Sequence, residues 1–412
     1  MRILIIFVAM LSTGALPAQT LDDYLKIALE NNPGIRAKQT AYEAARQKLP
    51  QARALPDPTV NASVFLRPMM LPMGNQLGSI SAMQMFPWFG ALDAMEHEAA
   101  QMAEVKSQEV AVAQNALFFS IKNAWYPLLE LEELVRIQRE NLRVLETDKE
   151  LATIKFQHGQ APMVDAIRAD IMIDEVKTGI TLLEQKRRPL EIAFNRLLNR
   201  ADSLPVAISG SLTEMQSHIS ARPDSLLSGN PALAVFDKQI QAAIAEEQAA
   251  DFQRKPMIGI GLQYMPLVKR KDGDLQLPPN NGRDMLMPMA TVTIPIWRKK
   301  YDAAVAERRF MQHMYANMRQ DMENELASMY AMTRYDVEKA AQMVELLEKQ
   351  MIKTQQAIDL MMAAYSNAGQ DFEEILRFQQ QLFRYRMEKV SAQTEYQQAQ
   401  AKLDYLTGSV SR

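Results

Sequence analysis

Two segments of the chain alternate apolar and polar residues with a period of two. The first lies between Pro58 and Pro87, and the second lies between Pro256 and Pro295. Such alternation is typical of strands that have one apolar and one polar face. The alternating runs are roughly 8 to 10 residues long, which is the length that a tilted strand needs to cross a bilayer. We therefore expect one pair of antiparallel strands in each segment.

Nearly all of the remaining chain has the apolar spacing and the residue types of helices. The longest uninterrupted segments are 90–157, which contains only Pro127 as a break, and 297–366. At 1.5 Å per residue, each would be roughly 100 Å long. After breaks at Gly159 and Gly369, a second helix returns antiparallel to each. No globular core buries rods of that length, so we expect a coiled coil or a helical barrel.

The same order of elements occurs twice. Asn32-Pro33 near the first helix recurs as Asn230-Pro231, and the Gly159-Gln160 break recurs as Gly369-Gln370. An internal repeat of about 200 residues indicates a duplicated half, so the function is expected in what two such halves enclose.

The chain begins with Arg2 and a short apolar run that ends at Leu11, followed by small residues. This run is too short to span a bilayer and is typical of a secretory signal. The expected organisation is a signal peptide at 1–18; a first repeat at 19–200 with strands at about 59–86 and a long helical hairpin at 90–200; a connector at 201–229; a second repeat at 230–408 with strands at about 257–294 and a long hairpin at 297–408; and a short tail at 409–412.

Composition excludes several classes of site. The sequence has no cysteine, so it forms neither disulfides nor thiolate metal sites. Its formal net charge of -3 gives no indication of nucleic-acid binding. The four histidines are scattered, and no nucleophile elbow, phosphate-binding glycine loop or pair of catalytic carboxylates is present. We therefore expect neither an enzyme nor a cofactor.

Two halves supply four strands, and a four-stranded sheet has two open edges, which a lipid environment does not tolerate. Closure requires further chains. Three copies would supply twelve strands, enough for a barrel with a lumen, and would place a tube of long helices on one side of it.

At this point the chain resembles the TolC-like outer-membrane efflux proteins. The resemblance covers the whole mature chain and rests on the order of modest motifs in duplicate. These are the two Asn-Pro pairs, the proline-closed strand pairs, the glycine breaks, and the helix ends Leu197-Leu198-Asn199 and Leu406-Thr407-Gly408. The fold it implies is mainly α with a small transmembrane β part: duplicated helix–strand–strand–helical-hairpin halves that form a trimeric 12-stranded β-barrel on a long α-helical tunnel.

The function implied by the resemblance is that of a channel-tunnel in a tripartite efflux system, with the barrel in the outer membrane and the tunnel in the periplasm. The channel would be a passive exit duct. Its implied partners are two further copies of the chain, a periplasmic adaptor protein, an inner-membrane pump of the RND type and outer-membrane lipid. The substrate is left open, with copper or silver ions and drugs among the candidates.

The alternative, from another class, is a periplasmic coiled-coil adaptor or scaffold that does not span a membrane. An adaptor would have one helical hairpin flanked by lipoyl-like β segments rich in Gly and Val. This chain has two hairpins and two strand pairs, which favours the channel.

Three aromatic residues follow the prolines that close the strand pairs: Trp88, Phe89 and Trp297. Amphipathic rings favour the boundary between lipid and water, so these residues are candidates for a membrane-interface belt. Ordinary packing between the barrel and the helices is the alternative.

Charged residues recur beyond the two helix breaks. The resemblance implies that acidic residues here line the constricted periplasmic end of the tunnel, which makes Asp165, Asp371, Glu373 and Glu374 candidates. Each of Asp165 and Glu374 is followed three positions later by an arginine, Arg168 and Arg377. The alternative is a pair of exposed i,i+3 ion pairs worth a few tenths of a kcal/mol.

Methionine is abundant, with 28 residues, and several share a strand face with polar residues. The more polar face of a membrane barrel faces the lumen. Thioethers there suit Cu(I) or Ag(I), whereas methionine also fills irregular space. The candidate metal ligands are Met83, Met85, Met285, Met287 and Met289.

Overall fold

A computed structural model describes residues 20–210, 212, 227–271, 278–368 and 372–409. The expected signal peptide, most of the expected connector and nearly all of the expected tail lie outside these residues. The chain divides into two compact units. The sheet unit comprises Lys38–Val110 and Pro231–Met322, and the helical unit comprises Met1–Ala37, Ala111–Asn230 and Glu323–Arg412. Each unit draws residues from both sequence repeats.

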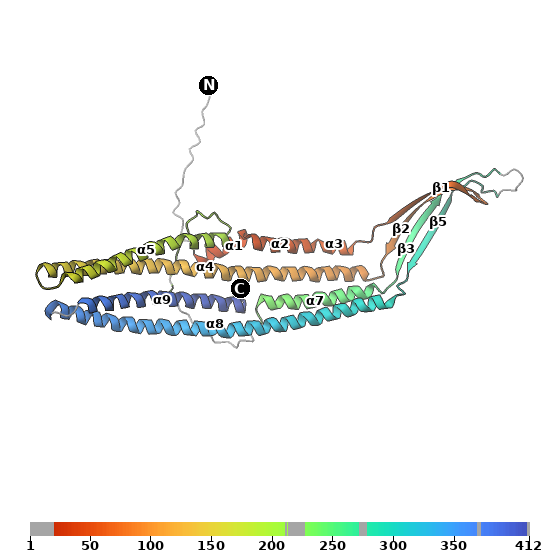
Figure 1. The fold of residues 1–412 in the computed structure, drawn as a ribbon. Coiled ribbons are helices and arrows are strands. Elements are labelled where there is room, and N and C mark those ends of the chain that lie inside the picture. Colours follow the sequence, from red (N-terminus) through yellow and green to blue (C-terminus); the bar gives the residue numbers. More distant parts are fainter. Residues whose placement is uncertain (1–19, 211, 213–226, 272–277, 369–371, 410–412) are drawn as a thin grey trace, which may run out of the picture. The chain divides into compact units, whose positions relative to one another are not determined.

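The sheet unit contains an antiparallel sheet built from both repeats (Figure 1). Its strands follow the order β1-β2-β3-β5, where β1 is Thr59–Leu71, β2 is Gly74–Phe86, β3 is Met257–Met265 and β5 is Met285–Thr293. A two-residue strand, β4 (Leu267–Val268), pairs with β2 outside this path. The strand pair of one repeat thus continues directly into that of the other, through the ladder between β2 and β3.

The strands of the first hairpin are longer than the roughly 8 to 10 residues expected from the sequence. The first strand continues to Leu71, and the second begins at Gly74. The register between them shifts after Val64 and resumes at Met69. Pro68 lies inside this irregularity, and a bulge is one of the few places where a strand accommodates a residue that has no N–H group. The bulge therefore lets β1 continue past Pro68 as far as Leu71.

The second hairpin contains a proline within a strand. Pro288 lies in β5 opposite Leu262 of β3. In the described part of the chain β5 is an edge strand, and an edge strand tolerates proline because one side of its backbone is unpaired there.

Helices of the sheet unit flank the sheet in the sequence. The later part of α2 (Pro33–Arg46) and α3 (Lys48–Arg53) come before β1, and the first part of α4 (Ala91–Gln157) follows β2. Before and after the second hairpin are α7 (Pro231–Phe252) and the first part of α8 (Arg298–Ala368).

The helical unit consists of α1 (Leu21–Asn31), the later parts of α4 and α8, and the helices that return beside them, α5 (Met163–Leu197) and α9 (Phe372–Thr407) (Figure 1). This mainly helical fold with a small antiparallel sheet confirms the predicted fold class. None of the helices in the described part of the chain is long and apolar enough to cross a membrane.

An aromatic cluster forms the centre of the larger core in the helical unit. Tyr24 of α1, Trp125 of α4 and Phe194 of α5 are buried, and their ring centroids lie 5.1 to 5.6 Å apart. The Tyr24 hydroxyl also accepts a hydrogen bond from the Ala207 N–H at 3.0 Å. The cluster therefore fixes the first helix against the first long hairpin.

The duplicated Asn-Pro pairs have the same role in each repeat. Asn32 Nδ2 donates to the Leu197 carbonyl at the end of α5, at 2.9 Å. Asn230 Nδ2 donates to the Leu406 carbonyl at the end of α9, also at 2.9 Å. The last carbonyls of a helix have no partner within it, so each asparagine satisfies a group that the helix leaves open. Each repeat thereby ties its first helix to the end of its last.

Candidate functional site

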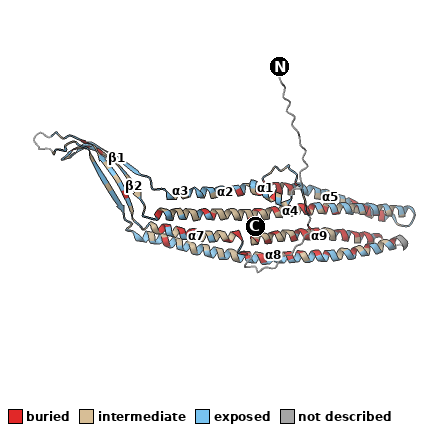
Figure 2. Ribbon diagram, turned by 180° about the vertical axis from the view of Figure 1, so that it is seen from behind, coloured by how far each residue is buried: buried red, intermediate tan, exposed pale blue. Residues whose placement is uncertain are grey.

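The two faces of the sheet differ in chemistry. Residues that pair directly across strands share a face. One face is apolar, and many of its side chains are strongly exposed: Val64 is 84%, Ile260 62% and Leu286 62% exposed. Figure 2 shows many exposed residues along the strands. The other face carries Ser, Thr, Asn, Gln and Gly together with methionines: Thr59, Asn61, Ser63, Ser79, Ser81, Met83, Met85, Met257, Gly259, Gly261, Gln263, Met265, Met285, Met287, Met289, Thr291 and Thr293.

Two glycines of β3 lie between methionines of its neighbours. Met83 of β2 and Met289 of β5 both pair with Gly261, while Met85 pairs with Gly259. A Cβ atom at Gly259 would lie 2.5 Å from the Met85 sulfur and 3.4 Å from the Met83 sulfur. Both thioethers therefore occupy the space above a strand that has no side chain there. Farther along the same face, Met287 pairs with Gln263 and Met285 with Met265.

The aromatic residues after the strands are only partly brought together. The Trp88 and Phe89 rings are in edge-on contact, with centroids 6.1 Å apart. Phe89 and Trp297 are 84% and 78% exposed, whereas Trp88 is 38% exposed and lines a cavity with Phe252 and Tyr301. Two of the three rings thus present most of their surface outward.

The charged residues beyond the helix breaks form the two ion pairs expected within the helices and one further pair that joins two helices. Arg168 of α5 pairs with Glu373 of α9, with a nitrogen–oxygen distance of 2.7 Å. Its distance to Asp165, the partner expected within the helix, is 3.9 Å. The expected pair between Glu374 and Arg377 is present at 3.1 Å. Because Asp165 is buried among apolar side chains, Arg168 reaches the more exposed carboxylate on the neighbouring helix. Asp371 lies outside the described residues.

A buried carboxyl group near these pairs was missed by the sequence analysis. Asp148 of α4 is 3% exposed, and burial raises its pKa to about 6, against the opposing effect of a hydrogen bond from Gln379 of α9. Burial, together with the charges of Asp165 and Asp148, also raises the pKa of the Tyr365 hydroxyl on α8. The available signal was spacing: Asp148 follows the buried Leu145 by three positions and therefore lies on the apolar stripe of α4.

The same region is held together by Lys155 and two aromatic rings. Lys155 donates to the Tyr365 carbonyl at 2.7 Å, and its ammonium lies 3.6 Å from the centroid of the Tyr365 ring. Tyr365 stacks on Phe372 of α9 at 5.2 Å. Lys155 thus joins α4 of the first hairpin to α8 of the second, near the Asp148 carboxyl.

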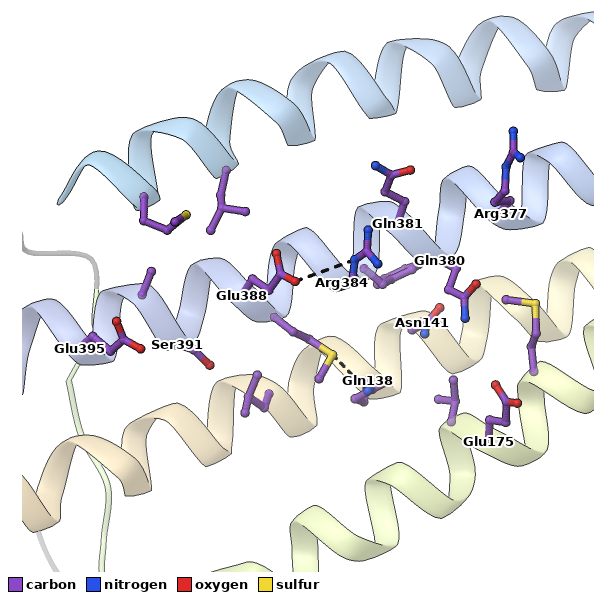
Figure 3. Close-up of a pocket in the computed structure, with 18 of the residues that line it drawn as sticks. Gln138, Asn141, Glu175, Arg377, Gln380, Gln381, Arg384, Glu388, Ser391 and Glu395 are labelled. Atoms are coloured by element: carbon purple, nitrogen blue, oxygen red, sulfur yellow. Dashed lines mark hydrogen bonds and ion pairs between the residues drawn. The ribbon is translucent and has the colours of Figure 1, made fainter. Parts of the chain in front are cut away.

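A cavity of about 1070 Å³ lies within the helical unit and is lined by α4, α5, α8 and α9 (Figure 3). Its lining mixes both charges with amides: Arg384 pairs with Glu388 on α9, and Gln138 of α4 donates to the Met387 sulfur at 3.2 Å. No patch of one charge dominates the labelled side chains.

Comparison with known proteins identifies the family. The family profile described as outer membrane efflux protein matches residues 24–200 and 223–409. The chain belongs to the outer membrane efflux protein family. The two matched segments follow the two sequence repeats, and the gap between them falls in the expected connector. The family assignment confirms the resemblance seen in the sequence, and it places the protein in the outer membrane with its helices in the periplasm.

Among curated proteins, this outer membrane efflux protein is similar to OpmQ of Pseudomonas putida, described as a pyoverdine export outer membrane protein. The two are 22% identical over 273 residues, which is 61% of this chain and 57% of OpmQ. The match thus spans less than two thirds of the relative's length.

Among solved structures, two illustrate how far the shared fold extends. A membrane protein from Pseudomonas aeruginosa superposes with a TM-score of 0.73 at 16% identity, covering 94% of this chain and 90% of that protein. The open state of the MtrE outer membrane channel of Neisseria gonorrhoeae superposes with a TM-score of 0.73 at 17% identity, covering 94% and 88%. At such identities the likeness establishes the fold.

Across the residues that the structure describes, no group of three His, Cys, Asp or Glu side chains is placed to hold a metal ion. The family and the structural neighbours are channel proteins rather than enzymes.

Proposed function

We propose that this protein is the outer-membrane channel-tunnel of a tripartite efflux system. It acts as a passive exit duct for substrates that an inner-membrane pump of the RND type delivers through a periplasmic adaptor. The chain itself supplies no energy to transport; its part is to provide a continuous polar path through the lipid.

The observation that carries this proposal is the two-faced, open sheet. One face is exposed and apolar, which costs free energy in water and none in lipid. The edge strands β1 and β5 present unpaired backbone groups in the described part of the chain, which lipid does not tolerate. Pairing β1 of one copy with β5 of the next removes both edges. Three copies give the twelve-stranded barrel, with the methionine-bearing face toward the lumen.

The experiment is a test of assembly and of membrane association. Membranes that contain the protein are extracted with carbonate and then with detergent, and the solubilised protein is measured by light scattering. We expect the protein to resist carbonate and to have the mass of three protomers. A monodisperse monomer that remains soluble without detergent would overturn the proposal and favour the periplasmic adaptor or scaffold.

The end of the helical unit beyond the helix breaks is proposed as the constriction of the tunnel. Arg168 and Glu373 tie α5 to α9 there, and Glu374 and Arg377 form a second pair beside them. Such links between neighbouring helices hold a closed end together in a way that isolated i,i+3 pairs do not. Asp165 and Asp371 belong to the same proposed constriction.

The aromatic residues Trp88, Phe89 and Trp297 are proposed as the belt at the periplasmic boundary of the membrane. The exposure of Phe89 and Trp297, directly after the strands, supports this role, because exposed large rings favour an interface between lipid and water.

The substrate is a separate question. OpmQ, the relative from Pseudomonas putida, exports pyoverdine by its description, and compounds like pyoverdine are one class of substrate proposed for this duct. Copper or silver ions are the other class, and the luminal methionines are the feature of this chain that favours them.

A further inference from the structure

We infer that the luminal face of the sheet carries a thioether site for soft monovalent cations, Cu(I) or Ag(I), built from Met83 and Met85 of β2 and Met289 of β5 around Gly259 and Gly261 of β3. The inference rests on the proposed function, since it takes the polar face of the sheet as the wall of a duct. It adds a defined binding site on that wall for one of the two substrate classes named above.

The distribution of methionine on the sheet is the first observation. Where β2, β3 and β5 pair, in residues 79–86, 257–265 and 285–293, the large apolar side chains of the polar face are methionines, whereas the opposite face carries mainly Ile, Leu, Val and aromatic residues. General hydrophobicity does not explain this difference, because branched aliphatic residues have the higher strand propensity. A thioether differs from them in being a soft ligand.

The second observation is that the sulfurs converge. The Met83 and Met85 sulfurs both lie within 3.4 Å of one point, the position that a Gly259 side chain would occupy. One ion placed above the strand reaches both sulfurs with small changes in side-chain torsion, and methionine has three such torsions.

The third observation concerns Met289. It pairs with Gly261 on the other side of β3 from Met83. Neighbouring strands are about 4.8 Å apart, so Met83 and Met289 flank one strand that has no side chain between them. A methionine side chain is long enough to extend from β5 to a point above the middle of β3. Met289 is therefore the third proposed ligand.

Gly259 and Gly261 are therefore part of the proposed site. Alanine at 259 would place a carbon 2.5 Å from the Met85 sulfur and force that side chain away. The competing explanation is that methionine only fills the space above two glycines. The two explanations differ on one point: filling needs the shape of the side chain, whereas binding needs its sulfur.

The test uses the full-length protein in detergent. Its methionine methyl groups are labelled with carbon-13, and Ag(I) is added while methyl spectra are recorded. Leucine keeps the volume and removes the sulfur, so Met83→Leu/Met85→Leu is the test variant. The matched control is Met314→Leu/Met318→Leu, which removes two neighbouring methionines of α8 with 44% and 45% exposure.

We expect the Met83, Met85 and Met289 methyl resonances to shift together and to saturate. Half-saturation should require at least about tenfold more Ag(I) in the test variant, because that variant lacks two of the three proposed sulfur ligands, and it should be unchanged in the control. A duct must bind its substrate weakly enough to release it. Gly259→Ala should weaken binding while all three sulfurs remain. Equal affinity in the wild type and the test variant, or shifts spread evenly over all methionines, would overturn the inference.

The light-scattering mass and the single-channel conductance are measured on the same samples. A conducting trimer in which Ag(I) does not shift the luminal methionine resonances would overturn only the cation site. A protein that forms no trimer and no channel would instead reject the proposed function. If the test variant fails to assemble, the titration of the wild type alone decides, since its resonances either shift selectively or do not.

Discussion

Replacing Asp148 by asparagine is expected to stabilise the end of the helical unit at neutral pH. The Asp148 carboxyl is 3% exposed and has a pKa of about 6, compared with an ordinary value of 3.8. Gln379 on α9 and the Tyr365 hydroxyl on α8 interact with Asp148. Tyr365 also interacts with Asp165 on α5 and with Lys155 on α4. None of the ion pairs found in the described residues supplies a cation to the Asp148 carboxylate, so only the hydrogen bond from Gln379 offsets the cost of burying its charge.

The sign follows from proton binding. Between about pH 4 and pH 6 the folded state holds a proton on Asp148 that the unfolded state has lost, so stability falls as the pH rises through this window and is constant above it. One pKa unit corresponds to about 1.36 kcal/mol, and the raised pKa therefore costs about 3 kcal/mol near pH 7.5. Asparagine carries no charge and avoids this cost.

Hydrogen exchange measures the effect locally, which suits a membrane protein that unfolds irreversibly as a whole. For Asp148→Asn, amides near this end of α4 and α9 should gain roughly 10- to 100-fold in protection at about pH 7.5 and little at about pH 4, after correction for intrinsic rates. The matched control is Glu150→Gln, an exposed carboxylate on the same helix, which should change protection at neither pH. Equal protection in Asp148→Asn and the wild type at both pH values would refute the reasoning.

Three further predictions follow from the sheet and from the hairpin ends. Ile260→Lys, on the apolar face of β3, should cost about 2–4 kcal/mol and reduce the yield of trimer in membranes, whereas Gln263→Lys on the polar face of the same strand should not; equal yields would contradict the assignment of faces. Arg168→Ala with Arg377→Ala should raise single-channel conductance in planar bilayers and weaken its salt dependence, and unchanged conductance at low and high salt would reject the constriction. Asn230→Ala should lower protection in the last turn of α9 by about 1–3 kcal/mol, because it leaves the Leu406 carbonyl without its donor; full protection there would show that the tie is dispensable.

The elements of this fold were predictable because their periodicities are strong and uninterrupted. Alternation around Val60 and Ile260 gave the strands, and breaks at Gly159 and at Asn32-Pro33 gave the helix boundaries. The length of the first strand was not predictable, because Pro68 indicates the end of a strand in the sequence and only the bulge shows that the strand passes through it.

The contacts of the candidate site were harder to predict, because they depend on which helices meet. The partner of Arg168 three positions away is visible in the sequence, but Glu373 lies on another helix of the other repeat. Asp148, within a run of charged residues, resembles part of a solvated face until the neighbouring Leu145 is taken into account. The approach of two sulfurs over Gly259 required the register between β2 and β3.

The paired asparagine ties also bear on how such a chain arose. Since Asn32 closes the first repeat on itself and Asn230 closes the second, neither repeat borrows this closure from the other. A half-length ancestor would have been a complete building block, and six identical copies would have formed the ring that three double-length chains form in the proposed trimer. Fusion then freed the halves to diverge. The long hairpin helices of the first repeat contain Pro127 and Pro189, whereas α8 and α9 of the second contain no proline, and the two glycines between the methionines belong to the second.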